Sequence, residues 1–202
     1  MTAVQEDLNT PGPPGLLPWA RPLTVDDLEA LPDDGHRYEL LDGMLLVSPA
    51  PVLRHQGLVG ALCVYLYTTA PDHLWVLPGP VGIRLATDTE LQPDLVIAAR
   101  SDWDGKYLYK PPVLAVEVLS PSMRMVDLSL KKAAYERFGT PSYWVLDPNP
   151  DDPFLLVFEL DDGGYREAAH VRGTDSVDLE RPFPVRLRPS DLTAGRLPRS
   201  GR

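Results

Sequence analysis

The stretch VLAVEVL at residues 113–119 is almost entirely apolar and carries one charged side chain, Glu117, near its centre. A short apolar run rich in Val and Leu is typical of a strand buried on both faces of a sheet. Alternation along the strand places Ala115 and Glu117 on one face and Val116 and Val118 on the other. An ionised carboxylate is costly at that depth unless a positive charge compensates it. The stretch therefore predicts a central strand that carries a compensated charge.

A second run of the same kind, DLVIA at residues 94–98, opens on Asp94 directly after Pro93. Proline is tolerated at the first position of a strand, where its missing N–H does least harm. If the two strands are neighbours, Asp94 and Glu117 lie side by side, and a bound divalent cation relieves their repulsion. Oxygen ligands favour Mg²⁺ or Mn²⁺ over Zn²⁺. The alternative is that Asp94 is a turn residue and Glu117 lies at a hydrated end of the sheet.

A helix is predicted over residues 127–138, because Gly139 and a following proline end the apolar periodicity there. At 100° per residue, Lys131 falls in the middle of the apolar arc that includes Leu130, and Lys132 falls at its edge. A lysine within a buried stripe needs a carboxylate partner or a route to solvent. We expect the Lys131 ammonium to lie beside both carboxylates, although a purely structural ion pair satisfies the same geometry.

The other predicted elements alternate between hairpins, helices and strands, which indicates an α/β (α+β) domain with one mixed sheet. Residues 23–190 are expected to form a single domain. Proline-rich residues 1–22 are expected to be a flexible arm, and residues 191–202 a mobile tail. The remaining elements are a helix at 24–31, a hairpin at 37–48 turning at Asp42-Gly43, a helix at 52–69, strands near 74–77 and 81–86, a strand at 142–147, and a hairpin formed by 155–160 and 165–171.

Composition narrows the functional classes. The 202 residues include 19 Lys and Arg, 29 Asp and Glu, and one cysteine, for a net charge of −10. The single cysteine excludes a disulfide scaffold, and no run reaches the roughly 18 apolar residues of a membrane span. With no signal peptide at the start, we expect a cytoplasmic protein. The acidity argues against loose, nonspecific binding of DNA. The charge is uneven, because residues 100–140 carry 7 basic and 5 acidic side chains.

These residues resemble a known pattern. Pro93-Asp94, followed after 22 residues by Glu117-Val118-Leu119, is similar to the PD-(D/E)XK signature of restriction-endonuclease-like nucleases. The longer segments resemble a compact bacterial family of restriction endonucleases within that superfamily, over about residues 23–190. Those segments are YELLDG at 38–43, SP at 48–49 followed by His55, EVLSPS at 117–122, and YWVLD at 143–147, together with Asp127, Lys131, Tyr135 and Gly139. The resemblance implies a restriction-endonuclease-like core: a central mixed sheet flanked by helices, with added hairpins.

The sequence departs from the basic signature at one position. The lysine expected two residues after the glutamate is Leu119 here, and Lys131 on the following helix stands at the position that matches the family. The resemblance then implies that Asp94 and Glu117 bind Mg²⁺, or Mn²⁺, with the backbone carbonyl of Val118 as a further ligand. A metal ion in such a site lowers the pKa of a bound water. Lys131 is expected to orient that water and to offset charge on the transition state.

Two further residues are candidates for the same site. Glu39 could extend the metal shell, and His55 could contact a phosphate or position Glu39. The alternatives are that Glu39 is a hairpin residue facing water and that His55 is a local cap or packing residue.

The resemblance implies a magnesium-dependent endodeoxyribonuclease that hydrolyses phosphodiester bonds in DNA. Because nucleases that cut duplex DNA often pair two active sites, we also expect a homodimer. The displaced lysine and the acidic charge leave another class open, a catalytically idle binding or assembly module that keeps the nuclease fold. A metal and a lysine do not define the substrate, so a hydrolase of another phosphate ester is a third alternative.

Overall fold

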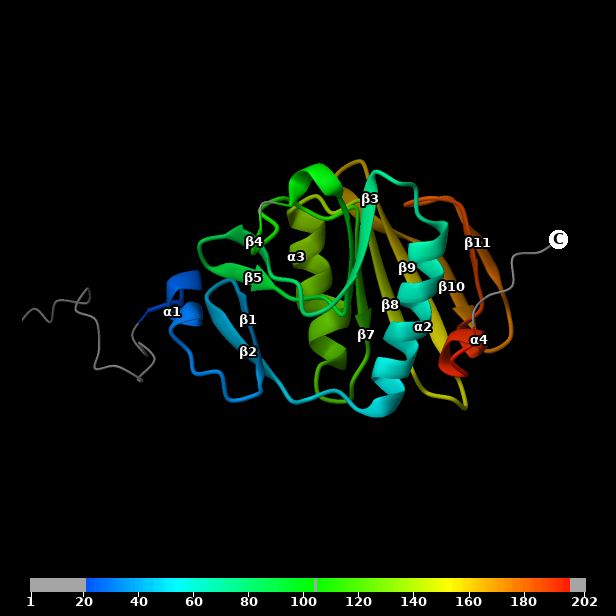
Figure 1. The fold of residues 1–202 in the computed structure, drawn as a ribbon, viewed down its shortest axis with the longest axis horizontal. Coiled ribbons are helices and arrows are strands. Elements are labelled where there is room, and N and C mark those ends of the chain that lie inside the picture. The colour runs from blue at the N-terminus through cyan, green and yellow to red at the C-terminus, as the bar shows by residue number, and fades with distance from the viewer. Residues whose placement is uncertain (1–20, 104, 197–202) are drawn as a thin grey trace, which may run out of the picture.

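The structure is a computed structural model and describes residues 21–103 and 105–196. Its main sheet has six strands in the order β10-β9-β8-β7-β6-β3 (Figure 1). The β7–β8 pair is parallel and the other neighbouring pairs are antiparallel, so the sheet is mixed, as predicted. Its strands are β3 (Leu74–Pro78), β6 (Leu95–Ala99), β7 (Leu114–Val118), β8 (Ser142–Asp147), β9 (Phe154–Asp161) and β10 (Gly164–Arg172).

The apolar stretch at residues 113–119 forms the central strand β7, and all five residues of this strand are buried. It pairs with β6 on one side, where Leu95 lies opposite Val116, and with β8 on the other, where Val145 lies opposite Glu117. Burial on both faces explains why the run is apolar almost without interruption. The prediction that these two apolar runs are neighbouring strands is confirmed.

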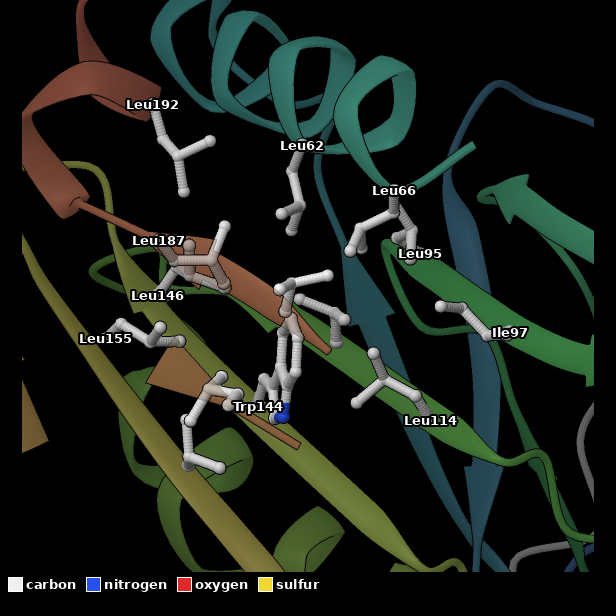
Figure 2. Packing of buried hydrophobic residues seen from close by; sticks show 14 of the residues in the cluster. Leu62, Leu66, Leu95, Ile97, Leu114, Trp144, Leu146, Leu155, Leu187 and Leu192 are labelled. Carbon is white, nitrogen blue, oxygen red and sulfur yellow. The ribbon is translucent and has the colours of Figure 1, made fainter. Parts of the chain in front are cut away.

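One face of the main sheet is covered by helix α2 (Leu53–Thr69), which the sequence predicted. Leu62 and Leu66 of this helix pack against Leu114 and Trp144 of the sheet (Figure 2). Three elements that the sequence analysis did not predict close the same layer. They are β11 (Val177–Leu179), β12 (Val185–Leu187) and α4 (Pro189–Thr193).

The opposite face, which carries Glu117, is covered by a helix in two parts and by a second sheet. The helix begins as the π-helical segment η2 (Val126–Lys131) and continues as α3 (Lys132–Arg137). The second sheet has the strand order β2-β1-β5-β4. Its strands are β1 (Arg37–Leu41), β2 (Met44–Ser48), β4 (Ile83–Ala86) and β5 (Thr89–Leu91); the short helices α1 (Val25–Glu29) and η1 (Arg100–Asp102) complete the elements.

The hairpin β1–β2 turns at Asp42-Gly43, as the sequence predicted. Both residues have positive φ, 50° and 76°. Two consecutive positive φ values are the mark of a type I′ turn, which matches the twist of the flanking strands. This hairpin brings β1 against the site described below.

The helix after β7 differs from the expectation. A regular α-helix places Leu130 on the buried arc, whereas its side chain is 44% exposed. The wider π-helical turn rotates Leu130 toward solvent while Lys131 stays fully buried. Tyr143 Oη on β8 donates a hydrogen bond of 2.8 Å to the Asp127 carbonyl oxygen and ties this segment to the sheet.

The chain ends also differ in part from the expectation. Residues 189–193, where the tail was expected to begin, form α4, and its Leu192 is fully buried in the core. Most of the expected arm, residues 1–20, and the end of the tail, residues 197–202, lie outside the described residues. In the part of the chain that the structure describes, no helix has the length and apolar character needed to cross a bilayer.

Candidate active site

Four elements bring charged side chains together in the interior, on the Glu117 face of the main sheet. Glu39 comes from β1, Asp94 immediately precedes β6, Glu117 lies on β7, and Asp127 and Lys131 lie on η2. Each of the five is at most 5% exposed. The apolar run at 113–119 predicted the burial of Glu117, and the apolar arc of the following helix predicted that of Lys131; the structure confirms both.

Lys131 is the centre of one half of this cluster. Its Nζ lies 2.9 Å from both carboxylate oxygens of Glu39 and donates a hydrogen bond of 3.0 Å to Glu117 Oε1. Asp127 Oδ1, one helical turn earlier, lies 3.6 Å away. The sequence predicted that Lys131 lies beside Glu117 and Asp94. The contact with Glu117 is confirmed, whereas the predicted contact with Asp94 is wrong. Glu39 takes that place because the β1 strand of the second sheet packs over this part of β7.

Burial and charge oppose each other in this half of the cluster. Burial by itself lowers the pKa of Lys131, but the three surrounding carboxylates outweigh it, so the pKa is raised and the ammonium stays charged. Burial raises the pKa of Glu117, and the neighbouring carboxylates add to that effect. Burial also raises the pKa of Asp127, to about 6, despite the nearby lysine. Burial and mutual repulsion therefore oppose full ionisation of Glu117 and Asp127, and Lys131 only partly offsets this effect.

Asp94 is the centre of the other half. Its Oδ2 accepts hydrogen bonds from His55 Nε2 at 3.0 Å and from the Val118 N–H at 2.8 Å. Its Oδ1 accepts one from Arg37 Nη1 at 2.8 Å. Burial tends to raise the pKa of Asp94, but His55, Arg37 and the Val118 amide together lower it to about 2. Asp94 therefore lies in a bend just before β6, as the alternative allowed, and its carboxylate is buried, ionised and held by three hydrogen bonds.

The two second-tier candidates are both brought to the cluster, each with a different partner from the one expected. Glu39 is fully buried against Lys131 and accepts a hydrogen bond of 2.8 Å from the Gln92 N–H. The reading of Glu39 as a hairpin residue facing water is therefore wrong. His55, in the first turn of α2, holds Asp94 and not Glu39.

Arg37 is the residue that the sequence analysis missed. It lies two positions before Glu39 on β1, so its side chain leaves the strand on the same face. Besides its hydrogen bond to Asp94, its Nε lies 3.8 Å from Glu39 Oε2. The usable signal was this period-two spacing from Glu39, which places any charge at position 37 beside the same cluster.

A groove with a volume of about 1240 Å³ passes over the cluster. Its wall includes Asp94, Glu117 and Arg37, together with the segment Val118–Arg124 that follows β7. Lys131, by contrast, is not among the groove-lining residues. Glu117 thus lies between the groove and the buried lysine, and ligands of α/β sheets commonly bind at this position, beyond the carboxyl end of a strand.

The donor set suits a hard divalent cation held by few protein ligands. Glu39, Asp94, Glu117 and Asp127 stand against Arg37 and Lys131, which leaves a formal charge of −2 when all six are ionised. Among residues 21–103 and 105–196, no three Asp, Glu, His or Cys side chains converge as a complete metal cage. Mg²⁺ needs no such cage, because it keeps several waters and is held by one or two carboxylates with the substrate phosphates.

In sequence and in fold, this chain is similar to proteins that are described as nucleases. The family model Uma2, described as "Putative restriction endonuclease", matches residues 25–194. The chain belongs to the Uma2 family. A search of curated proteins gives no match. The fold is similar to a crystal structure from Anabaena variabilis described as "a putative nuclease belonging to DUF820", with a TM-score of 0.69 and 17% identity over 86% of this chain and 99% of that one.

The Uma2 assignment agrees with the recognition made from the sequence. It supports a nuclease, and the structural likeness supports the nuclease-type fold. The match runs from the start of α1 through α4, so it includes every residue of the buried cluster and of the groove wall above it.

Proposed function

We propose that this Uma2 protein is a magnesium-dependent endodeoxyribonuclease, with Mn²⁺ able to replace Mg²⁺. The observation that carries the proposal is a buried cluster of four carboxylates against two cations, in which Asp94, Glu117 and Asp127 line the groove. A buried surplus of negative charge is costly for the fold and is offset by a bound cation. Phosphate, which Mg²⁺ commonly bridges to protein carboxylates, is the ligand that suits such a site.

Asp94 and Glu117 are the proposed metal ligands, with the Val118 carbonyl as a third. Oδ1 of Asp94 accepts one hydrogen bond, from Arg37, and an ionised carboxylate oxygen has room for a second partner. Oε1 of Glu117 accepts a hydrogen bond from Lys131. Among the described residues, Oε2 of Glu117 accepts none and stays available. When bound, the metal would supply a water of lowered pKa and would stabilise charge on the phosphate.

The other residues of the cluster hold these two ligands in place. His55 and the Val118 N–H fix the orientation of Asp94 from two sides. Glu39 holds Lys131, and Lys131 in turn holds Glu117. Because Lys131 does not line the groove itself and donates a hydrogen bond to Glu117, which does, we assign it a positioning role for that carboxylate and, through it, for a water bound beside it.

One observation favours the non-catalytic alternative, a binding or assembly module with a nuclease fold. Lys131 is fully buried and surrounded by three carboxylates, so it presents no free ammonium to the groove. A lysine held in this way also satisfies the requirements of a purely structural ion pair. The two functions differ in whether the protein cuts DNA.

Cleavage of plasmid DNA separates the two functions. We expect nicking or linearisation by the wild-type protein with Mg²⁺ or Mn²⁺ and none with EDTA. Asp94→Ala and Glu117→Ala are expected to lower the rate by at least about 100-fold, and Lys131→Ala to lower it as well. A parallel assay on RNA and on a simple phosphate ester tests whether DNA is the preferred substrate. Failure to cut any substrate, or equal rates for wild type and variants, rejects the enzymatic proposal.

We further propose that the protein acts as a homodimer in the cytoplasm, with DNA as its partner. A nuclease that cuts both strands of a duplex commonly combines two active sites, and homodimers are the commonest oligomers. Light scattering of the purified protein is expected to give twice the monomer mass of 22.3 kDa. A monomer mass across the micromolar range rejects the dimer.

A further inference from the structure

Because Lys131 is buried below the groove, the cation of the cluster that lines the groove is Arg37. The Arg37 side chain is 27% exposed, whereas that of Lys131 is 0% exposed. Arg37 lines the groove together with Asp94 and Glu117. It is thus the one basic residue among the described residues that contacts an acid of the buried cluster and also forms part of the groove wall, His55 apart.

The contacts of Arg37 are incomplete. Nη1 donates a hydrogen bond of 2.8 Å to Asp94 Oδ1, the oxygen that has room for a metal. Nε is buried and has no hydrogen-bond partner, since Glu39 Oε2 lies 3.8 Å away. A guanidinium carries five N–H donors in a planar fork that fits the oxygens of a phosphate. Nη2 is not among the buried unpaired atoms and donates no hydrogen bond to the described residues, so it is the donor that Arg37 keeps for a ligand in the groove.

We propose that Arg37 couples metal binding to phosphate binding at this site. In the protein without metal, the guanidinium compensates Asp94 and Glu39 and opposes the approach of a divalent cation. A phosphodiester in the groove pairs with the guanidinium and offsets its charge, so that a metal binds Asp94 Oδ1 more tightly. This inference rests on the proposed function, since it concerns the same carboxylates. It adds that metal and phosphate bind to the site cooperatively. Cooperativity of this kind is reciprocal, so each ligand raises the affinity for the other equally.

Calorimetric titration with Mn²⁺ tests the coupling without any measurement of activity. The probe is a thymidine dinucleotide with a phosphorothioate linkage, which resists cleavage. For the wild type, we expect the dinucleotide to raise the affinity for Mn²⁺ by at least about fivefold. Without the dinucleotide, we expect Arg37→Gln to bind Mn²⁺ at least about fivefold more tightly than the wild type does. With the dinucleotide, we expect the Mn²⁺ affinity of this variant to rise by less than about twofold.

Two further variants keep the test informative. Arg37→Met repeats the charge removal without a hydrogen-bond donor, in case Arg37→Gln does not fold. Arg137→Gln is the matched control, because Arg137 makes a comparable ion pair with Asp42 on the surface, with an Nη2–Oδ1 distance of 2.6 Å, and does not line the groove. It is expected to bind Mn²⁺ as the wild type does.

The outcomes separate this inference from the proposed function. If wild type binds Mn²⁺ and both Arg37 variants bind it equally or more weakly, the coupling is wrong and the metal site stands. If wild type, Arg37→Gln and Arg37→Met all fail to bind Mn²⁺ with and without the dinucleotide, the metal-dependent function and the coupling both fail. Tighter Mn²⁺ binding by the Arg37 variants than by the wild type, with little further gain from the dinucleotide, supports the coupling.

Discussion

At the scale of single residues, the two neighbouring lysines of the η2–α3 helix have opposite environments. Lys131 is fully buried among carboxylates, whereas Lys132 is only partly buried, with its ammonium 4.8 Å from the Phe158 ring. Removing one partner of a buried ion pair leaves uncompensated charge behind. We expect Lys131→Met to lower the free energy of unfolding by about 3–5 kcal/mol.

The matched control is Lys132→Met, expected to cost less than about 1 kcal/mol because it removes only partly exposed cation–π contacts with the Phe158 and Tyr165 rings. Both values come from urea unfolding in EDTA, followed by circular dichroism. Equal costs for the two substitutions contradict the placement of Lys131 at the centre of the cluster.

Asp94 gives a prediction about acid stability. Its pKa lies at about 2 in the folded protein against an ordinary value of 3.8. A depressed carboxyl pKa stabilises the fold above the ordinary value, and the contribution is lost as the pH falls toward the folded value. The shift corresponds to about 2 kcal/mol. In EDTA at pH 6, the free energy of unfolding of the wild type is expected to exceed that of Asp94→Asn by about this amount. The difference is expected to shrink between pH 4 and about pH 2.

Urea unfolding at a series of pH values between 2 and 6 measures this difference directly. A constant difference across the series contradicts the assignment of Asp94 as an ionised, hydrogen-bonded carboxylate.

At the scale of elements, two glycines with opposite surroundings test how α2 and the approach to β6 are built. Gly60 lies in the exposed side of α2, and a Cβ there meets nothing within 4 Å. Gly60→Ala is therefore expected to raise the free energy of unfolding by about 0.5–1 kcal/mol. A Cβ on Gly79 falls 2.4 Å from the Pro93 carbonyl oxygen, directly before Asp94. Gly79→Ala is therefore expected to lower the stability of the protein. Thermal unfolding of both variants shows whether the two substitutions change the melting temperature in opposite directions.

Continuous apolar runs and a period of 3.6 residues were sufficient to predict two central strands and the long helix that frame the site. VLAVEVL and DLVIA become β7 and β6 because both faces of these strands are buried, and residues 52–69 become α2 because one face of that helix is buried. The three-residue strand β5 and the pair β11–β12 were missed, because segments this short carry too few repeats to show a period.

The sequence predicted most residues of the candidate site, but it predicted fewer of the contacts between them. Asp94, Glu117 and Lys131 were placed in one buried cluster by the sequence, and the structure brings all three there. The pairing of Lys131 with Glu39 depends on how the second sheet packs over β7, which no local pattern encodes. The same packing brings Arg37 to Asp94 across 57 positions of sequence.

At the scale of the whole molecule, the net charge of −10 predicts how DNA binding depends on the metal. Without a divalent cation, the acids of the groove wall repel phosphate, so affinity is expected to be weak in EDTA at all salt concentrations. Ca²⁺ is expected to raise it, since it can occupy an oxygen-lined site. Fluorescence anisotropy with a labelled duplex compares the two conditions. Affinity that is equally strong in EDTA and at high salt contradicts this account of the charge.

The central claim is that the surplus of buried carboxylates beside the groove is a divalent-cation site. The most direct measurement is a crystal structure with bound Mn²⁺, located by its anomalous scattering. The account predicts a peak within about 2.6 Å of one oxygen of Asp94 and one of Glu117. Crystals of wild-type protein that show Mn²⁺ elsewhere, or no Mn²⁺ at this position at millimolar concentration, would contradict it.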